Sequence, residues 1–282
     1  MKLLIIGVSG MLGQTLFKVA TQQSDLEVYG TVRRRDTRVL DFLQTAESQI
    51  FECDLEVAVD PLLYCSPDVV INCAGIIKQK GIAQTPLSYI RVNALAPYVL
   101  ADLCERRGIR LIQLSTDCVF SGRKGHYSES DIPDPIDLYD RSKLLGEVTH
   151  APHLTVRTSF IGFERYHNQG LSLLDWFRRQ SGDIKGYTRA IWSGLTSLEL
   201  ARNLVSLARR PEVTGLLHLC GEKISKYDLL VLAKDIFDKA EVVVKPENNY
   251  VCDRSLISLR LSELAITVPT LRQMLIELRD FK

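Results

Sequence analysis

The 282-residue chain has no excess of charge of either sign, since 35 lysines and arginines stand against 34 aspartates and glutamates. A net charge of +1 gives no overall field that would attract nucleic acid or an anionic membrane, so an acidic small molecule would need a local basic pocket. The sequence also lacks an apolar run of the roughly 20 residues that a membrane span needs. We therefore expect neither nucleic-acid binding nor membrane insertion.

Closely paired cysteines are absent as well. The seven cysteines include no CxxC, and several lie in apolar runs such as VVINCAG. Scattered thiols of odd number are typical of small buried hydrophobes in a reducing compartment, so we expect a cytoplasmic protein without a metal site. The apolar start MKLLIIGVSGML is broken by Gly7 and Gly10 and has no small-residue cleavage site, which favours a buried first strand over a signal peptide.

The first 160 residues alternate apolar runs with helical stretches. Strands are expected at residues 2–7, 26–32, 67–75, 109–120 and 153–162, and a helix from Tyr139 to about Thr149. Continuous Val, Ile and Leu runs separated by helices indicate a parallel sheet covered on both faces. The expected fold is therefore α/β, a doubly wound Rossmann sheet.

The pattern loosens after about residue 160, and residues 165–200 are predicted to be rich in loops with a single helix. Helices are expected at 197–210, 225–240 and 270–281, and short strands at 215–221 and 241–246. We expect residues 1–160 to form the NADP-binding Rossmann domain, with 190–215 packing back onto it. Residues 161–189 and 216–282 would form a smaller C-terminal substrate-binding lobe.

A GxxGxxG turn, GVSGMLG, joins the first strand to the first helix. Glycines let the backbone turn tightly and let a pyrophosphate approach the helix N-terminus, where free N–H groups favour anions. The alternative is a turn without a ligand, because this spacing alone is weakly specific; its place after the first strand favours dinucleotide binding. The residues expected at the cofactor are Gly7, Gly10, Met11, Leu12 and Gly13.

The second strand ends in TVRRRD, where an NAD-binding chain usually has an acidic residue for the ribose hydroxyls. Arg33 and Arg34 would instead hold a 2′-phosphate with their planar guanidinium groups, so NADPH is expected rather than NADH. The alternative is a solvated basic turn, because Asp36 follows at once. Further along, Asp54 and Leu55 are predicted to meet the adenine, and the strand end Cys73–Ala74–Gly75 to line the cofactor.

Tyr139 and Lys143 are four residues apart in YDRSK, so they share one face of the predicted helix. A tyrosine has an ordinary pKa of ~10, and a neighbouring ammonium favours the phenolate and lowers that pKa. Such a pair can act as a general acid toward a carbonyl oxygen. Two exposed surface residues are the alternative, since the spacing is common by chance.

The strand that contains LSTDCVF places Ser115 and Thr116 at its carboxyl end, where ligands bind in open parallel sheets. A hydroxyl there would hold a substrate carbonyl against Tyr139. The nucleotide turn, the hydroxyl and the YxxxK pair follow one another along one βα framework. Together they predict a site for hydride transfer.

At this point the chain resembles an extended short-chain dehydrogenase/reductase, and more closely the dTDP-4-dehydrorhamnose reductase family. The matching stretches are GVSGMLG, STDCVFSG, YDRSKLLGE, VRTSFIG, GLTSLELA and GLLHLCGEKISKYDL. The resemblance implies that Thr116, Tyr139 and Lys143 are catalytic. It also implies NADPH-dependent reduction of the C4 ketone of a nucleotide-linked 4-keto-6-deoxy sugar, bound by the C-terminal lobe.

The sequence departs from that family where the sugar would bind. Cys118 stands where an aromatic residue is common in the family, and Lys78 in the stretch NCAGIIKQKG is expected to meet a sugar or a phosphate. Asp117 is expected to contact the substrate beside Cys118. The substrate is thus either dTDP-4-dehydrorhamnose or a UDP-linked 4-keto-6-deoxy-N-acetylhexosamine, serving surface polysaccharide or O-antigen synthesis. Some relatives bind magnesium at a dimer contact; the ligands have no match here, so a homodimer is expected without a metal.

Four other side chains are candidates of a weaker kind. Arg157 is expected to pair with a structural carboxylate or with the substrate diphosphate. Lys185 and Arg189 would suit the substrate diphosphate, although plain surface would have the same composition. Asn93 is unfavourable inside a helix and is expected to bond backbone near the catalytic strand, beside the cofactor.

Two other functions remain open on the sequence. The same fold serves as a non-catalytic cofactor-binding regulatory subunit, as in methionine adenosyltransferase, and an intact Thr116, Tyr139 and Lys143 set argues against that role. A sugar-nucleotide epimerase is the second alternative. A dehydratase is disfavoured, because Asp117–Cys118 follows Thr116 where an Asp–Glu pair would be usual.

Overall fold

The computed structural model describes residues 1–34, 37–57, 60, 65–78, 85–164 and 172–281. Within these residues the centre of the molecule is a seven-stranded sheet in the order β11-β6-β5-β4-β1-β2-β3. Every neighbouring pair of its strands is parallel. The strands are β1 (Lys2–Ile6), β2 (Glu27–Val32), β3 (Ile50–Glu52), β4 (Val69–Asn72), β5 (Arg110–Thr116), β6 (Leu154–Thr158) and β11 (Gly215–His218).

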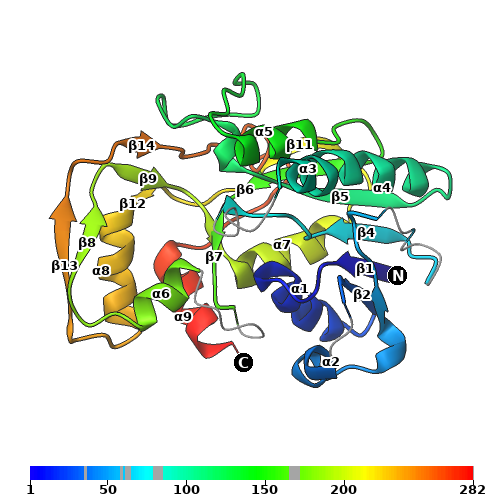
Figure 1. Ribbon diagram of the computed structural model, residues 1–282, viewed down its shortest axis with the longest axis horizontal. Coiled ribbons are helices and arrows are strands. Elements are labelled where there is room, and N and C mark those ends of the chain that lie inside the picture. Colours follow the sequence, from blue (N-terminus) through cyan, green and yellow to red (C-terminus); the bar gives the residue numbers. More distant parts are fainter. Residues whose placement is uncertain (35–36, 58–59, 61–64, 79–84, 165–171, 282) are drawn as a thin grey trace.

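Helices cover both faces of this sheet (Figure 1). Helices α1 (Met11–Thr21) and α7 (Ser197–Ala208) pack together on one face. The opposite face carries α3 (Pro86–Tyr89), the π-helical turn η4 (Ile90–Leu95), α4 (Ala96–Glu105) and α5 (Leu138–Leu145). Two further elements, α2 (Thr37–Leu43) and the short turn η1 (Glu47–Gln49), lie near β2 and β3. The predicted doubly wound α/β fold is confirmed.

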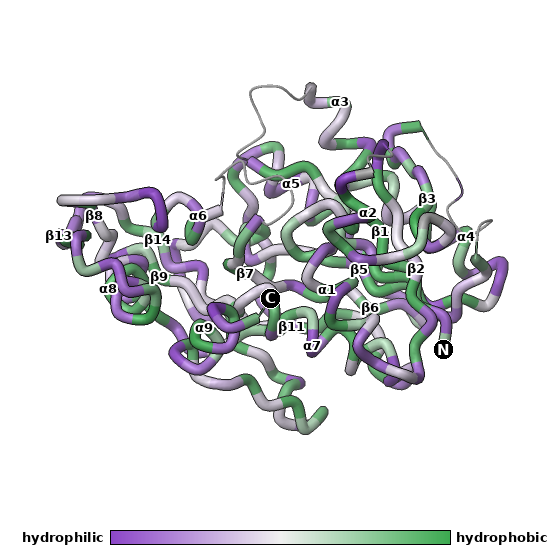
Figure 2. The backbone as a smooth tube through the Cα atoms, turned by 90° about the horizontal axis from the view of Figure 1, so that it is seen from below, coloured by the Kyte–Doolittle hydropathy of each residue, from purple (hydrophilic) through white to green (hydrophobic). Residues whose placement is uncertain are grey.

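The alternation of side chains along β1 explains why both faces need a cover. Leu3 and Ile5 belong to the hydrophobic cluster under α1 and α7, whereas Leu4 and Ile6 belong to the cluster under α4. All four side chains are almost fully buried, and burial of apolar surface is the main stabilising contribution to folding. Figure 2 shows the hydrophobic stretches concentrated where β1, β2 and β5 run together.

Helix α5 is shorter than the sequence predicted. Its N-cap is Asp137, whose carboxylate accepts the Asp140 N–H at 2.8 Å. It ends at Leu145 instead of near Thr149, and Gly146 follows. A Cβ on Gly146 would lie 1.9 Å from the Asn93 carbonyl oxygen, so glycine here lets α5 approach η4 closely.

The C-terminal part of the chain builds three smaller sheets beside the main one (Figure 1). β8 (Gly182–Tyr187) pairs with β13 (Val242–Glu247), β9 (Ala190–Trp192) pairs with β12 (Ile224–Ser225) and β14 (Cys252–Asp253), and β7 (Phe160–Ile161) pairs with β10 (Leu195–Thr196). The helices of this part are α6 (Leu173–Arg178), α8 (Lys226–Ile236) and α9 (Leu271–Asp280). None of the helices in the described ranges combines the length and apolar character that crossing a membrane requires.

The loop-rich prediction for residues 165–200 was wrong in its described part, which contains β8, β9 and β10. β8 hid its strand character because its two inward positions, Ile184 and Gly186, alternate with exposed polar residues such as Asp183 and Lys185. Glycine and charged residues are depleted in strands, so the apolar signal was too weak to find. Pairing with β13, almost 60 residues later, makes this segment a strand.

Candidate active site

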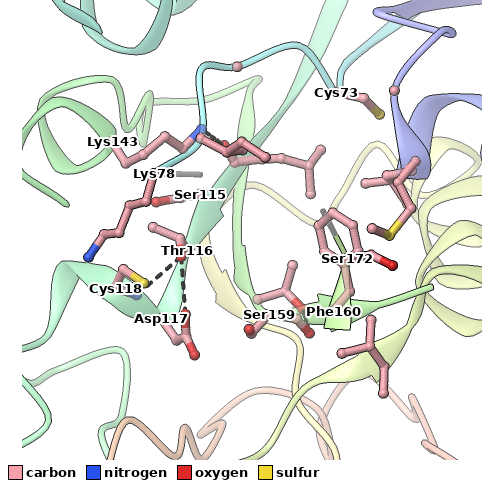
Figure 3. A pocket seen from close by; sticks show the side chains of 18 of the residues that line it. Cys73, Lys78, Ser115, Thr116, Asp117, Cys118, Lys143, Ser159, Phe160 and Ser172 are labelled. Atoms are coloured by element: carbon pink, nitrogen blue, oxygen red, sulfur yellow. Dashed lines mark hydrogen bonds between the residues drawn. The ribbon is translucent and has the colours of Figure 1, made fainter. Parts of the chain in front are cut away.

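A cavity of about 430 Å³ opens at the carboxyl ends of the central strands, where open parallel sheets bind ligands. Its walls come from the first turn of α1, the segment after β4, the end of β5, the inner face of α5, and the segment from β6 to β7. Trp192 of β9 and Lys226 of α8 complete it from the C-terminal part. Figure 3 shows Thr116, Asp117 and Cys118 on one side, with Ser159, Phe160 and Ser172 on another.

The glycine turn forms the end of the cavity at α1. Gly7 has a φ of +86°, which favours glycine, and a Cβ on Gly13 would lie only 2.2 Å from the Gly7 carbonyl oxygen. Gly10 is the N-cap of α1 and gives the helix no side-chain cap, so the N–H groups of the first turn keep their capacity to bind an anion. Gly10, Met11 and Leu12 line the cavity.

The segment after β4 crosses the cavity beside that turn. Cys73, Ala74 and Gly75 all line it, as the sequence predicted for a cofactor wall. Asn93 from η4 holds this segment in place, because its side-chain amide accepts the Ile76 N–H at 2.9 Å and donates to the Ile76 carbonyl at 3.0 Å. The predicted backbone bonds of Asn93 are confirmed, and they explain a buried Asn in a helix.

The end of β5 supplies the hydroxyl. Thr116 Oγ1 accepts the Cys118 N–H and donates to the Asp117 carboxylate, both at 3.1 Å, as Figure 3 shows with dashed lines. Tyr139 lines the same cavity, and the Thr116 hydroxyl is near enough to influence the pKa of its phenol. The predicted pair of Thr116 and Tyr139 is therefore brought together at the cavity.

The direction of the pKa shift of Tyr139 differs from the expectation. Burial raises the pKa of the phenol, and negative charge at Cys118 would act in the same direction, whereas the Thr116 hydroxyl opposes it. The ammonium of Lys143 donates to the Leu114 carbonyl at 2.6 Å, and burial lowers its own pKa to about 8. The prediction that Lys143 lowers the pKa of Tyr139 was thus wrong for this structure, and Tyr139 holds its proton at neutral pH.

Behind the reacting groups lies a buried ion pair. Arg157 bonds both carboxylate oxygens of Glu147, at 2.8 and 2.7 Å, and each side chain is less than a tenth exposed. Glu147 also accepts the Ser115 hydroxyl at 2.6 Å. Of the two partners expected for Arg157, the structure provides the structural carboxylate, and Arg157 does not line the cavity.

Lys78 lines the cavity but its ammonium is paired. It lies 2.7 Å from Asp137 and 2.6 Å from the buried Asp140, and 5.5 Å from the centre of the Tyr139 ring. Arg254 approaches Asp140 from the other side at 3.4 Å and donates to Cys118 Sγ at 3.2 Å. Lys78, Asp117 and Cys118 all line the cavity, which is where a substrate would have to bind. Their contacts with the substrate stay predictions.

The other predicted residues lie away from this cavity. Arg33 and Arg34 are exposed just after β2, and Asp54 and Leu55 follow β3 in a turn where the Asp54 carboxylate accepts the Glu56 N–H at 3.0 Å. Arg35 and Asp36 lie outside the described residues. Lys185 is exposed on β8 and pairs with Glu247 at 2.9 Å, and Arg189 is exposed in the turn before β9. The structure does not bring these last two to the cavity.

Two residues of the cavity wall were not among the predicted site residues. Lys226 is the first residue of α8, where a lysine is unfavourable because the positive end of the helix dipole is there. This unfavourable position is the one sequence feature that could have marked Lys226 as functional. Trp192 is buried, lines the cavity, and donates its indole N–H to Ser159 Oγ at 2.8 Å. Their partners lie far away in sequence.

Among the described residues, one group has the composition of a metal site: Glu105, His150 and His153, whose ligand atoms lie within 4.8 Å of one another. The Leu111 N–H donates to His153 Nδ1 at 3.1 Å, so the proton of the neutral ring is on Nε2. That nitrogen faces the Glu105 carboxylate at 3.3 Å. His150 hydrogen-bonds the same carboxylate at 2.7 Å, and the protonated Nε2 of the buried His153 does not offer a lone pair to a metal.

The chain is similar to several characterised proteins. It is 30% identical to dTDP-4-dehydrorhamnose reductase of Aggregatibacter actinomycetemcomitans over 251 residues, covering 85% of this chain and 79% of that one. It is 34% identical to a probable low-salt glycan biosynthesis reductase of Haloferax volcanii over 172 residues, which are 56% of this chain and about half, 52%, of that relative. It is 24% identical to methionine adenosyltransferase 2 subunit beta of Bos taurus over 258 residues, 87% of this chain and 75% of that one.

Solved structures share the fold over almost the whole length. A dTDP-4-dehydrorhamnose reductase ortholog of Clostridium acetobutylicum superposes with a TM-score of 0.78 at 24% identity over 99% of both chains. The same enzyme of Bacillus anthracis, in complex with NADP, superposes with a TM-score of 0.78 at 20% identity over 99% of this chain and 98% of that one. The model of the family described as the RmlD substrate binding domain matches residues 1–255. The chain therefore belongs to that family, which confirms the reductase family predicted from its motifs.

Proposed function

We propose that the protein is an NADPH-dependent reductase that converts the C4 ketone of a nucleotide-linked 4-keto-6-deoxy sugar to an alcohol. The observation that carries the proposal is the convergence of Thr116, Tyr139 and Lys143 on one cavity that also contains the first turn of α1. Membership of the family and the 30% identity to a dTDP-4-dehydrorhamnose reductase support it. A sugar nucleotide is the substrate class in this proposal.

The glycine turn fits a dinucleotide. A side chain at Gly13 would collide with the Gly7 backbone, and the first turn of α1 has no side-chain cap, so its N–H groups are suited to a pyrophosphate. Cys73, Ala74 and Gly75 would border the nicotinamide end, and Arg33 and Arg34, which are exposed after β2, would bind a 2′-phosphate. Asp54 and Leu55 would meet the adenine. The nicotinamide, when bound, supplies the hydride that reduces the ketone.

Tyr139 acts as the proton donor in this proposal. Its raised pKa keeps the phenol protonated at neutral pH, and because Thr116 lines the same cavity, a carbonyl oxygen between them would be held by both hydroxyl groups. Lys143, close to the Gly75 backbone, would bond the ribose next to the nicotinamide. These roles place one proton on the oxygen of the former ketone.

The nucleotide and the sugar are the finer part of the proposal. Cys118 gives more room beside Tyr139 than an aromatic side chain would, and Asp117 and Lys78 border the same space. This wall suits either dTDP-4-dehydrorhamnose or a UDP-linked 4-keto-6-deoxy-N-acetylhexosamine. We place the reaction in the cytoplasm, in the synthesis of surface polysaccharide or O-antigen, with residues 1–160 and 190–215 binding the cofactor and the remainder binding substrate.

A second candidate function has an observation of its own. The 24% identity to methionine adenosyltransferase 2 subunit beta extends over 87% of this chain, which favours a cofactor-binding regulatory subunit as the alternative. A sugar-nucleotide epimerase is a further alternative from the sequence. The retained Thr116, Tyr139 and Lys143 favour the reductase, because a regulatory subunit has no need of a proton donor.

A homodimer is also part of the proposal. Five large apolar side chains are between 46% and 64% exposed on the outer face of α3, η4, α4 and α5: Leu87, Ile90, Leu95, Tyr98 and Leu145. Contact with the same face of a second copy would remove this apolar surface from water. Light scattering on the purified chain, with Leu145→Lys as the disrupting variant, tests this assembly.

The test of the reductase is NADPH oxidation, followed as loss of nicotinamide absorbance, with two substrates made in situ. One is the dTDP-linked 4-keto-6-deoxyhexose and the other the UDP-linked 4-keto-6-deoxy-N-acetyl analogue. Turnover of either supports the proposal and identifies the nucleotide. Tight NADPH binding without reduction of either sugar would favour the regulatory subunit, and parallel assays with NADH measure the cofactor preference.

A further inference from the structure

Three lysines among the described residues line the cavity, and they differ in what holds their ammonium groups. Lys143 donates to the Leu114 carbonyl, and Lys78 is paired with Asp137 and Asp140. Among the hydrogen bonds and ion pairs of the described residues, Lys226 takes part in none. Its ammonium lies 4.5 Å from the centre of the Trp192 ring, over the indole face.

The surroundings of Lys226 are short of negative charge. It is the first residue of α8, whose N-cap Ser225 accepts the Asp228 N–H at 3.0 Å, so the positive end of an 11-residue helix adds to its own charge. The carboxylate of Asp117 attracts the Lys226 ammonium, but it already accepts the Thr116 hydroxyl and also lies in the field of Arg254. Burial lowers the pKa of Lys226 to about 8, against the attraction of Asp117.

We propose that Lys226 is a substrate-binding residue that holds an anionic oxygen of the sugar nucleotide, in a position between Asp117 and the face of Trp192. The inference rests on the proposed function and specifies where the substrate carries its charge. Two sources have this chemistry: the diphosphate, which both proposed substrates carry, and an acidic substituent of the sugar, which neither proposed sugar carries and which would replace them by an acidic sugar. In both, the contact is a charge-assisted hydrogen bond from the ammonium to an oxygen.

A purely structural role explains the arrangement less well. A lysine that only covers Trp192 would gain from turning its ammonium to open water, because charged side chains are costly to bury without a partner. Here the ammonium stays on the wall of the cavity, beside the residue that follows the catalytic Thr116. An anion of the substrate would supply the missing partner and would raise the pKa of Lys226 on binding.

The first experiment is titration calorimetry of the full chain, with NADP⁺ present, using UDP, UDP-glucose, UDP-glucuronic acid, dTDP and dTDP-glucose as probes. The proteins are the wild type, Lys226→Met, Lys226→Arg, and Lys223→Met as the matched control. Lys223 is exposed three residues earlier and lies outside the cavity lining. We expect Lys226→Met to weaken binding by about tenfold to hundredfold, the usual range for a hydrogen bond to a charged group. Lys226→Arg should stay within a few-fold of the wild type.

The probes separate the two sources of the anion. Equal losses with UDP, UDP-glucose and UDP-glucuronic acid would assign Lys226 to the diphosphate. A loss confined to UDP-glucuronic acid would assign it to an acidic group on the sugar. Wild-type affinity in Lys226→Met for every probe would overturn this inference alone, whereas a wild type that binds none of the probes would overturn the proposed function and this inference with it.

The pH dependence of binding gives an independent readout that a structural lysine would not move. Between pH 7 and 9.5 the wild-type affinity should fall as Lys226 loses its proton, by up to tenfold for each pH unit above its pKa, and Lys226→Arg should lack this decline because arginine stays charged. Lys143, Asp117 and Cys118 titrate in both proteins and Arg254 faces the site in both, so the difference between the two profiles isolates Lys226. Identical profiles would overturn the inference.

Discussion

The two sides of the cavity are built differently. On the side of the central sheet, three polar groups are held by hydrogen bonds: Thr116 by Asp117 and the Cys118 N–H, Lys143 by the Leu114 carbonyl, and Ser115 by a buried Glu147–Arg157 pair. On the side of the C-terminal part, Lys226 lies against Trp192 without a hydrogen bond or ion pair among the described residues.

This contrast separates two tasks of an active site. Groups that move a proton need fixed positions, because small displacements of reacting atoms cost much of the rate, and buried hydrogen bonds supply that rigidity. Groups that choose among substrates can keep unsatisfied bonding capacity until the ligand arrives, because the ligand then completes them.

The largest effect is expected for Tyr139→Phe, which removes the proposed proton donor and little else. NADPH binding should stay near the wild-type value, while kcat falls by about 10² to 10⁴-fold, the usual contribution of a general acid. Steady-state rates and NADPH titrations of the same preparations measure both. Tyr187→Phe, on the exposed strand β8 away from the cavity, is the matched control. Near-full turnover by Tyr139→Phe would remove Tyr139 from the mechanism.

The next effect is on stability and concerns the buried pair behind the reacting groups. Arg157→Met would leave the Glu147 carboxylate buried without its guanidinium, which typically costs about 3 to 5 kcal/mol. Urea unfolding measures it. Arg209→Met, which breaks an exposed pair with Asp25, should cost only about 0 to 1 kcal/mol. Equal costs for the two variants would mean that the sheet side is no more rigidly held than the surface.

The sequence revealed most of the sheet side because its signals are local. The apolar runs, the spacing of Gly7, Gly10 and Gly13, and the four-residue step from Tyr139 to Lys143 need no distant partner to be recognised. That step placed the two side chains on one face, but it could not show that the Leu114 carbonyl takes the ammonium or that burial raises the pKa of Tyr139. The choice between a structural carboxylate and the substrate diphosphate as the partner of Arg157 likewise depended on Glu147, which follows α5 and faces the guanidinium.

The C-terminal part was harder to predict because its structure comes from distant pairings. β8 is recognised as a strand only through β13, and Lys226 reaches the cavity because β12 pairs with β9 and starts α8 beside Trp192. No local period in IKGYTRAIW or EKISKYDL contains that information. The substrate contacts predicted for Lys185 and Arg189 fell on an exposed strand and turn for the same reason.

A smaller effect is expected at the proposed cofactor site. Its arginines follow β2, whereas the hydrogen-bonded Ser115, Thr116 and Lys143 lie at the end of β5 and on α5. Arg33→Ala combined with Arg34→Ala should weaken NADPH by about tenfold to hundredfold, as for hydrogen bonds to a charged group, and leave NADH almost unchanged. Fluorescence titration with both cofactors measures the ratio. Arg141→Ala, an exposed arginine of α5, serves as the control. Equal losses for both cofactors would show that these arginines do not recognise the 2′-phosphate.

The smallest effect is expected on the pH dependence of stability. It concerns His218 on β11, where the central sheet contacts the C-terminal part through the Ile257 carbonyl. Its Nδ1 donates to the Tyr127 and Ile257 carbonyls and its Nε2 accepts from Arg157 at 3.3 Å, so a proton on Nε2 would face the guanidinium. Burial lowers the pKa of His218, and that of His153 as well, although Glu129 and Glu105 oppose the shifts.

In the unfolded chain the two histidines are therefore protonated near pH 6.5, whereas in the folded chain they are protonated only at lower pH. The stability that these two histidines contribute is present above that pH and is lost as the pH falls below it, at no more than about 1.4 kcal/mol per pH unit for each. Urea unfolding at pH 7.5, 6.5 and 5.5 should show this decline, with a smaller slope in His218→Asn. If His218→Asn left the slope unchanged, the pH dependence of stability would come from other groups, and the protonation of His218 would have no effect on stability.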